Sequence, residues 1–257
     1  MPLLDRMKRE TALKFHDELA LDHFSEIDID LAFYSFIRAA YYRKDVKDVL
    51  DYGAGRNRYE QDFDPAINSC YIRELRDLRF GGATVTAADV DPDVMSHPTS
   101  HRQVVIDPKG PLPFADESFD LIVSDYVFEH VENAQLVAGE LQRVLRTGGF
   151  LFARTPNKYG YVKMASAAVP NRLHHAALKR ISPQRKERDT FPTYYRLNSK
   201  RDLQRHFSQC EVAAINDSWE PAYFFGKPWL YRLLLLVHKL LPKALGTASI
   251  FILKKRG

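Results

Sequence analysis

The sequence predicts an α/β protein built on a largely parallel sheet with helices on both faces. Short apolar runs alternate with segments of helical pattern between residues 48 and 153. A Gly-x-Gly turn, Gly53 to Gly55, directly follows the first of these runs. Acidic or amide side chains stand where several runs end, and such strand ends form the ligand-binding edge of a parallel sheet. We therefore expect a binding site at that edge.

Composition limits the class of protein. The chain has 257 residues, 45% hydrophobic and 27% charged, which suits one large globular domain. A formal charge of +4 is weaker than the bias of dedicated nucleic-acid binders, so no nucleic-acid partner is expected. Cys70 and Cys210 form no metal or redox motif, and a reducing cytoplasm fits them. Residues 1–14 lack a signal-peptide core, so we expect a cytoplasmic protein.

The elements are expected in the following order. Residues 1–44 have a helical pattern with grouped aromatic residues, which either pack on the core or supply one tyrosine that caps the ligand. Strands are expected at residues 48–51, 84–88, 104–106, 119–124, 150–153, 211–215 and 248–253. Helices are expected at residues 66–79 and 133–145, ended by Gly81-Gly82 and Gly148-Gly149, and after an N-cap at Asn198 through Phe207.

We expect a single domain over residues 1–257, with an N-terminal helical segment at 1–44 and the ligand-binding core at 45–157. Residues 158–192 and 218–246 are interpreted as insertions or a lid beside the site. The basic run 172–188 is either a solvated loop or a lid that attracts an anionic substrate. The apolar segment 229–241 is too short and too interrupted to span a bilayer. It packs on the core or a partner chain, or it makes peripheral contact with a membrane.

Three strand ends carry candidate binding residues for a nucleotide-type cofactor. The glycine turn lets the backbone approach a ligand, and Asp51 would meet a cationic group there. Asp89 can accept both hydroxyl hydrogens of a ribose. Asp107 can accept from the exocyclic amine of adenine, and Lys109 offers the backbone N–H that Pro108 lacks. Asp89 and Asp107 each have an alternative role in a turn. The spacer between Gly55 and Asp89 is long, so residues 58–65 are expected to loop outward.

Further motifs complete a set that resembles a known family. They are Leu50-Asp51-x-Gly53-x-Gly55, Asp89, Leu112-Pro113-Phe114, Phe119-Asp120, Glu129-His130-Val131, Arg143-Val144-Leu145 with Gly148-Gly149, and Thr155-Pro156-Asn157. In this order and spacing, over residues 46–157, the set resembles the class I S-adenosylmethionine-dependent methyltransferases. It is most similar to the type 11 small-molecule branch, which includes the ubiquinone-biosynthesis O-methyltransferases.

The resemblance implies a Rossmann-like three-layer sandwich whose seven-stranded sheet is mostly parallel with one antiparallel strand. It also implies S-adenosylmethionine as methyl donor. Asn57 replaces the third glycine of the family's loop, and Asn tolerates positive φ. By position, Asp51, Gly53 and Gly55 would hold the methionine end, Asp89 the ribose, and Asp107 and Lys109 the adenine, with Ser124 or Asp125 near the methionine amine. Val90, next to Asp89, is a further expected cofactor-binding residue.

His130 is the candidate catalytic base. Its imidazole can remove a proton while an acceptor oxygen attacks the methyl group; alternatively, Glu129-His130 only orders its loop. Quinone-pathway relatives bind a divalent metal through a Glu-x-x-Glu-His pattern, but Tyr126 stands at the first position here, so no metal is expected. The expected acceptor-side residues are Tyr126, Asn157, Tyr194, Tyr195 and Arg196.

The expected function is methyl transfer to a small-molecule acceptor, at oxygen, with an anionic or lipid-linked acceptor as one option. RNA methylation is an alternative, but Ser124-Asp125-Tyr126-Val127 is not the motif of the base amino-methylases. A non-catalytic scaffold with the same fold is a second alternative. A nicotinamide-dependent hydride transfer is less favoured, because the third glycine is missing. The oligomeric state is left open by the sequence.

Overall fold

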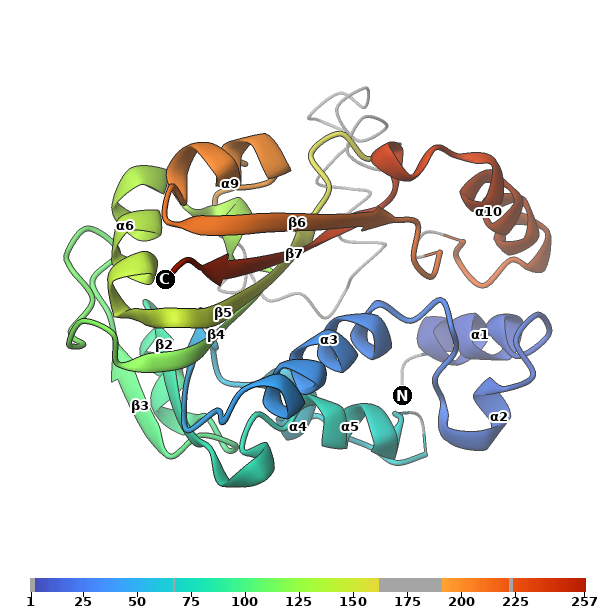
Figure 1. The fold of residues 1–257 in the computed structure, drawn as a ribbon. Helices are drawn as coiled ribbons and strands as arrows, with labels where there is room; N and C mark the ends of the chain where they lie inside the picture. Colours follow the sequence, from blue (N-terminus) through green and yellow to red (C-terminus); the bar gives the residue numbers. More distant parts are fainter. Residues whose placement is uncertain (1–2, 67, 162–190, 222–223) are drawn as a thin grey trace.

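A seven-stranded sheet forms the centre of the computed structural model, which describes residues 3–66, 68–161, 191–221 and 224–257 (Figure 1). The strands lie in the order β3-β2-β1-β4-β5-β7-β6. Only β7 runs antiparallel to its neighbours. The bounds are β1 Asp48–Tyr52, β2 Thr84–Asp89, β3 Arg102–Val105, β4 Phe119–Asp125, β5 Leu145–Pro156, β6 Cys210–Asp217 and β7 Ala248–Lys255. The predicted fold class and its single antiparallel strand are confirmed.

Helices cover both faces of the sheet, which makes three layers (Figure 1). One face carries α3 (Ile29–Arg43), α4 (Arg58–Gln61) and α5 (Cys70–Arg76), and the other carries α6 (Ala134–Val144) and α9 (Lys200–His206). Short 3-10 turns occur at η1 (Phe80–Gly82), η2 (Pro92–Ser96), η3 (Phe128–His130) and η5 (Lys243–Leu245).

Alternate residues of the central strands feed two separate cores. Leu50 of β1 and Ile122 of β4 face the α6 and α9 side, together with the fully buried Phe128. Val49 and Leu121 face the α3 and α5 side. This follows from the two-residue period of a strand, because both faces of an internal parallel strand are covered. The two cores hold the carboxyl ends of β1, β2, β4 and β5 rigidly at one edge.

A third, smaller cluster lies at the end of the molecule where α1 (Leu3–Ala12) meets α10 (Pro228–Leu240), next to α2 (Leu19–Asp22) (Figure 1). Tyr231 of α10 is completely buried there against Phe224 and Ala12. The rings of Tyr231 and Phe224 meet edge to face, 4.6 Å apart. Within the described part of the chain, no helix is both long enough and apolar enough to cross a bilayer.

Several predicted element ends differ from the structure. Helix α6 ends at Val144, and Gly148-Gly149 lies inside β5, where the pairing with β4 shifts register. A Cβ on Gly149 would lie 2.8 Å from the Asp120 carbonyl oxygen, so the pair serves a strand irregularity rather than a helix end. Ser199, not Asn198, caps α9 by accepting from the N–H of Asp202. Residues 58–61 form α4 instead of a simple outward loop.

Candidate active site

The glycine turn after β1 has the backbone geometry that the sequence predicts. Gly53 has φ +78° and donates its N–H to the Ala88 carbonyl at 2.7 Å. A Cβ on Gly53 would lie 2.2 Å from Val127 Cγ2, so no side chain fits there. Gly55 has φ +53°, and nothing would lie within 4 Å of its Cβ. This turn therefore offers bare backbone facing open space, which suits a bound ligand.

Asn57 takes the place of the third glycine in the loop without distorting the backbone. Its φ is +51°, in the left-handed region that Asn tolerates. Its side-chain amide donates to Thr99 Oγ1 at 2.9 Å, and its side-chain oxygen accepts from the N–H of Glu60 at 3.2 Å. Asn57 thus caps α4 and ties the loop to the segment after η2.

Asp89 braces the glycine turn from the end of β2. One carboxylate oxygen accepts from the Gly55 N–H at 2.8 Å, and the other accepts from the Asp91 N–H at 2.8 Å. Burial raises the pKa of this carboxyl, against the two backbone donors that lower it. Each oxygen keeps a further lone pair, so the arrangement remains compatible with the predicted ribose contact.

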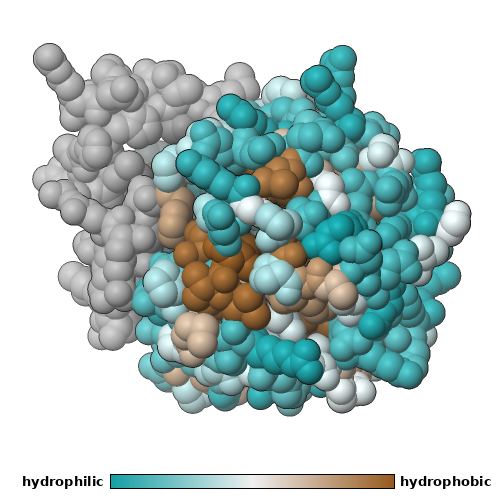
Figure 2. Space-filling view, turned by 90° about the vertical axis from the view of Figure 1, so that its left-hand side faces the viewer, coloured by the Kyte–Doolittle hydropathy of each residue, from teal (hydrophilic) through white to brown (hydrophobic). Residues whose placement is uncertain are grey.

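A small hollow lies at the end of β3, and Asp107, Ile106, Leu112 and Val137 are among the residues that line it. The Lys109 N–H, which we expected to serve adenine, donates to the Asp107 carboxylate at 2.9 Å in this structure. The side of the molecule that lies at the left in Figure 1 carries a group of hydrophobic residues within a mostly hydrophilic surface (Figure 2). Val90, directly after Asp89, is 40% exposed. Exposed apolar surface beside a carboxylate suits a flat heterocycle with an exocyclic amine.

A buried charge cluster joins the carboxyl ends of β4 and β5 to α3. Arg154 of β5 is 3% exposed and pairs with both oxygens of Asp125 and with Asp30. The Tyr34 hydroxyl donates to Asp125 at 2.9 Å. Burial would raise the pKa of Asp125, but Arg154 and the other partners hold it below its usual range. Asp125 is therefore an ionised carboxylate that is already paired.

Asp51 faces a cavity of about 180 Å³ that Gly53, Ala54, Tyr34 and Asp125 also line. Burial raises the pKa of Asp51 to about 7, and the nearby Asp125 adds to the shift. His97 Nε2 lies 3.7 Å from Asp51, yet burial lowers the pKa of His97 to about 4, so this histidine is neutral at pH 7. Arg76 lines the same cavity and lowers the pKa of Asp51, but among the described residues no permanent cation makes an ion pair with Asp51, so its carboxyl can pair with a cationic ligand group.

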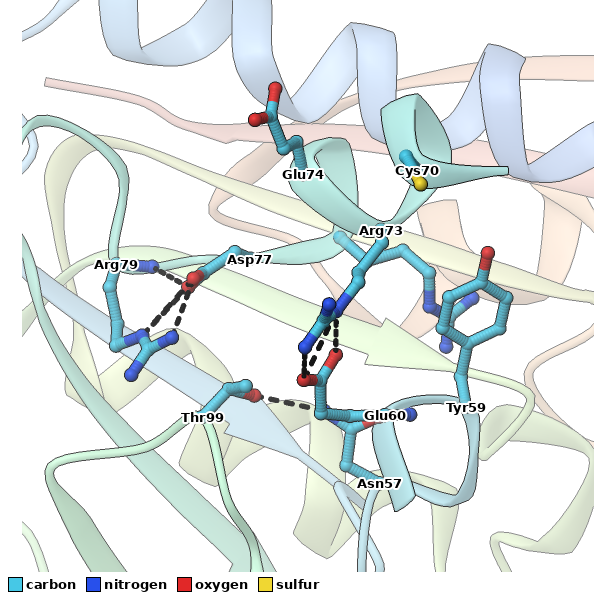
Figure 3. A pocket seen from close by; sticks show the side chains of 10 residues that line it. Asn57, Tyr59, Glu60, Cys70, Arg73, Glu74, Asp77, Arg79 and Thr99 are labelled. Atoms are coloured by element: carbon cyan, nitrogen blue, oxygen red, sulfur yellow. Dashed lines mark hydrogen bonds and ion pairs between the residues drawn. The ribbon is translucent and has the colours of Figure 1, made fainter. Parts of the chain in front are cut away.

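A second cavity, of about 300 Å³, lies on the α5 side and shares Asn57, Tyr59, Arg76 and Thr99 with the first. Its charged side chains are largely paired: Arg73 binds Glu60, and Arg79 binds Asp77 (Figure 3). Because these charges satisfy each other, this cavity has no strong preference for a charged ligand. This second cavity adjoins the one that Asp51 faces.

The Glu129-His130 motif forms η3 at the carboxyl edge of the sheet. Glu129 is 4% exposed and accepts from the Thr155 hydroxyl at 2.8 Å; burial raises its pKa. His130 Nδ1 lies 2.8 Å from the Pro192 carbonyl oxygen, so Nδ1 carries the hydrogen and donates. The remaining nitrogen, Nε2, lies 3.9 Å from Glu129. This tautomer leaves Nε2 with a lone pair.

The segment after residue 190 packs on η3. The N–H groups of Tyr194 and Tyr195 both donate to the Glu129 carbonyl, at 2.7 and 3.2 Å. The Arg196 guanidinium donates to the Glu132 carbonyl. The structure thus places the stretch that contains Tyr194, Tyr195 and Arg196, three of the expected acceptor-side residues, next to His130. In the sequence these residues lie about 60 positions after His130.

The two other expected acceptor-side residues have different surroundings. Tyr126 has φ +56°, is 40% exposed, and lies under the Arg154 guanidinium at 4.9 Å from its ring centre. Asn157 is 3% exposed; its amide donates to the carbonyls of Ala244 and Gly246, and its oxygen accepts from the Tyr159 N–H. Asn157 therefore braces the chain after β5, with its side-chain amide fully engaged.

Sequence reasoning missed Arg154, Arg76 and His97, and foresaw Tyr34 only as one of several tyrosines. Arg154 had one usable signal, a charged residue directly after the apolar run 150–153. Ser124, which was predicted, is fully buried, and its hydroxyl has no hydrogen-bond partner among the described residues. The basic run 172–188 lies outside those residues.

Comparisons with known proteins agree with this architecture. Residues 67–153 match the family model described as a methyltransferase domain. A methyltransferase chain of Haloferax volcanii, solved with the Trm112 methyltransferase activator, is 17% identical over 100% of this chain and 99% of its own, with a TM-score of 0.52. No curated protein sequence matches the chain.

Two further solved structures share the fold. One is described as a sarcosine dimethylglycine methyltransferase from Galdieria sulphuraria, 14% identical over 98% of each chain, with a TM-score of 0.51. The other is an S-adenosylmethionine-dependent methyltransferase from Archaeoglobus fulgidus, 14% identical over 89% of this chain and 95% of its own, with a TM-score of 0.50.

The methyltransferase-domain match over residues 67–153, together with the sheet order, supports an S-adenosylmethionine-dependent methyltransferase, and the glycine turn lies just before the matched residues. S-Adenosylmethionine is the methyl donor. The residues present suit this donor, since among the described residues nothing would contact a Cβ on Gly55 and the buried Ser124 hydroxyl at the same edge has no hydrogen-bond partner.

Proposed function

We propose that this enzyme transfers a methyl group to an oxygen of a small-molecule acceptor, in the manner of the quinone-pathway O-methyltransferases that its motifs resemble. We further propose an anionic or lipid-linked acceptor. The observation that supports oxygen as the target is the 2.8 Å contact between His130 Nδ1 and the Pro192 carbonyl, which holds the ring so that a neutral imidazole would keep its lone pair on Nε2. An oxygen nucleophile loses a proton on methylation, and a free imidazole lone pair can accept it.

The donor site follows from the strand ends. S-Adenosylmethionine supplies an electrophilic methyl group on a sulfonium centre. Asp51 would face the methionine amine, and its pKa of about 7 lets it carry charge once a cation is near. Asp89 would bind the ribose hydroxyls while it keeps Gly55 in place. Val90, Asp107 and Lys109 would bind the adenine, and backbone near Ser124 and Asp125 would complete the methionine end.

The acceptor side is built from η3 and residues 191–196. Glu129 holds Tyr194 and Tyr195 through its backbone carbonyl and Thr155 through its carboxyl. His130 would therefore be positioned on a rigid loop beside Tyr126, Tyr194 and Arg196. With both reactants bound at this edge, catalysis would be mainly positional, and His130 Nε2 would take the acceptor proton.

The test starts from the unknown acceptor. Purified enzyme and S-adenosylmethionine carrying a labelled methyl group are incubated with a host metabolite extract, and labelled products are analysed by mass. A product whose label survives as a methyl ether or ester supports the proposal. Label recovered only on nitrogen, on carbon or in RNA would overturn the assignment to oxygen.

His130→Ala then tests the base. Turnover should fall by roughly 10² to 10⁴ while donor affinity stays nearly unchanged, since the imidazole acts on the acceptor. Turnover is measured with the identified acceptor, and donor affinity by calorimetric titration. His206→Ala, which replaces the half-buried last residue of α9, is the matched control and should leave both quantities unchanged. Lost donor affinity with normal turnover at saturation would mean that His130 only orders its loop.

A further inference from the structure

Helix α10 presents an apolar stripe to the outside. Trp229, Leu233, Leu236 and Leu240 are 65%, 48%, 52% and 74% exposed. Their spacing of four, three and four residues places them on one side of the helix. The opposite side packs inward, where Tyr231 is completely buried. The helix is therefore already anchored by its inner side, and the apolar side chains of the stripe take no part in the core.

Basic residues accompany the stripe, and acidic residues are absent from this part of the sequence. Arg232 and Lys239 lie about 60° to 90° around the helix from the stripe, on the same flank. Lys227 precedes the helix, and Lys243, which pairs with Asp217, follows it. Residues 221–257 contain no Asp or Glu. Long cationic side chains beside an apolar stripe can extend toward anionic headgroups while the stripe enters the apolar layer.

The position of α10 relates this surface to the acceptor side. The helix follows β6, which runs parallel to β5, so both strands end at the same edge of the sheet (Figure 1). The Tyr161 hydroxyl lies 2.6 Å from His238 Nε2 of α10, which links the helix to the chain leaving β5. Asn157 adds a bond to the Gly246 carbonyl beyond α10. The helix is thus fixed beside the edge that carries His130.

We propose that α10 docks this enzyme on an anionic phospholipid bilayer, with the apolar stripe in the interface and Arg232 and Lys239 on headgroup phosphates. Thirteen residues form a helix about 20 Å long, which lies on a membrane and does not cross it. A second copy of α10 is a poorer occupant, because two basic flanks would meet with no acidic residue of residues 221–257 to offset them.

The proposal deepens the proposed function, since a docked helix would present the acceptor edge to amphiphilic molecules. The test of membrane docking nevertheless does not depend on methyl transfer. Full-length protein is sedimented with vesicles of phosphatidylcholine alone and of phosphatidylcholine mixed with phosphatidylglycerol. Binding to the mixed vesicles should be roughly tenfold tighter or more and should weaken as salt is raised.

Two double variants separate the contributions. Leu233→Gln/Leu236→Gln should weaken binding to mixed vesicles by about tenfold or more, through lost apolar burial. Arg232→Gln/Lys239→Gln should weaken binding by a similar factor and reduce its salt dependence. The matched control is Tyr42→Gln/Met95→Gln, which removes two apolar side chains that are 78% and 61% exposed elsewhere, and should bind like the native chain.

Three results would overturn the proposal. The native chain could bind neither kind of vesicle, or the α10 variants could bind as tightly as the control. Alternatively, ultracentrifugation could show a dimer that Leu233→Gln/Leu236→Gln dissociates, without vesicle binding by the native chain; the stripe would then be a protein interface. Normal vesicle binding with no labelled product would instead count against the proposed acceptor and leave the membrane site standing.

Discussion

At the scale of one residue, Asp51 is placed to bind a ligand at the cost of burying a carboxyl group, which disfavours its charged form. The sequence predicts its place after β1 and its exposure to a cationic ligand group. Only the structure shows that Asp51 shares a buried space with Asp125 and with a neutral His97. These three residues are far apart in sequence, and no local pattern reports a pKa that depends on burial and on distant charges.

Asp51→Asn should make stability depend differently on pH. The folded pKa of about 7 lies above the ordinary value, so folded protein holds a proton that the unfolded chain has lost between about pH 4 and 7. The native chain therefore loses stability as pH rises through that window, and the variant does not. The variant should unfold several degrees higher than the native chain at about pH 8, with little difference near pH 4.

Thermal unfolding followed by circular dichroism at several pH values measures this difference. Asp45→Asn is the control, because the Asp45 side chain is 81% exposed and should show no such trend. A constant offset between Asp51→Asn and the native chain at every pH would show that Asp51 has an ordinary pKa in the folded protein.

At the scale of elements, the sequence predicts strands and helices from their repeating hydrophobic pattern, but it misses irregularities at single positions. Each strand was found because its apolar run is bounded by turn residues. Gly148-Gly149 was misread as a helix end, because a glycine pair has the same local signature in a helix cap and in a strand irregularity. Which of these forms depends on β4, which pairs with residues on both sides of that glycine pair.

Arg154 links three elements, β4, β5 and α3, and its removal should be costly. Arg154→Met would leave the half-buried Asp125 and Asp30 with Arg76 as their remaining cation and should lower the free energy of unfolding by about 1 to 3 kcal/mol. Asp125→Asn/Arg154→Met should recover part of that loss, since one stranded charge is removed. Urea unfolding gives these values.

Lys254→Met, on an exposed position of β7, is the control for Arg154→Met and should change stability little. If Arg154→Met also left the unfolding free energy unchanged, the cluster would not stabilise the contact between α3 and the sheet. A double variant as unstable as the single one would show that Asp125 does not carry the stranded charge.

At the scale of the whole molecule, the sheet and the gathering of carboxylates at its carboxyl edge were predictable, but the packing around His130 was not. Alternation of strands and helices fixes a parallel sheet, and its carboxyl edge then collects Asp51, Asp89 and Asp125. The acceptor side depends on contacts between η3 and residues 191–196, which no periodic pattern signals. The two alternatives to a small-molecule enzyme gain no support from the fold or the domain match.

Donor binding should stabilise the whole domain. S-Adenosylmethionine at about 100 times its Kd should raise the free energy of unfolding by about 2.7 kcal/mol, because only the folded chain binds it. Asp89→Ala should weaken donor affinity by at least about 1 to 2 kcal/mol, through lost charge-assisted hydrogen bonds. Calorimetric titration measures the affinity, with Asp45→Ala as control. Unchanged affinity in Asp89→Ala would remove the ribose assignment.

The place of β7 in the sheet bears on how the chain is made. Its residues 248–255 fill the gap between β5 and β6, whose own sequence positions are much earlier. During synthesis, β5 therefore has one bare edge, and β6 has no neighbour, until those residues leave the ribosome. Bare apolar strand edges attract other chains, and pairing across long loops is slow. Chaperone supply during translation, more than the stability of the finished fold, would then set the yield of active enzyme.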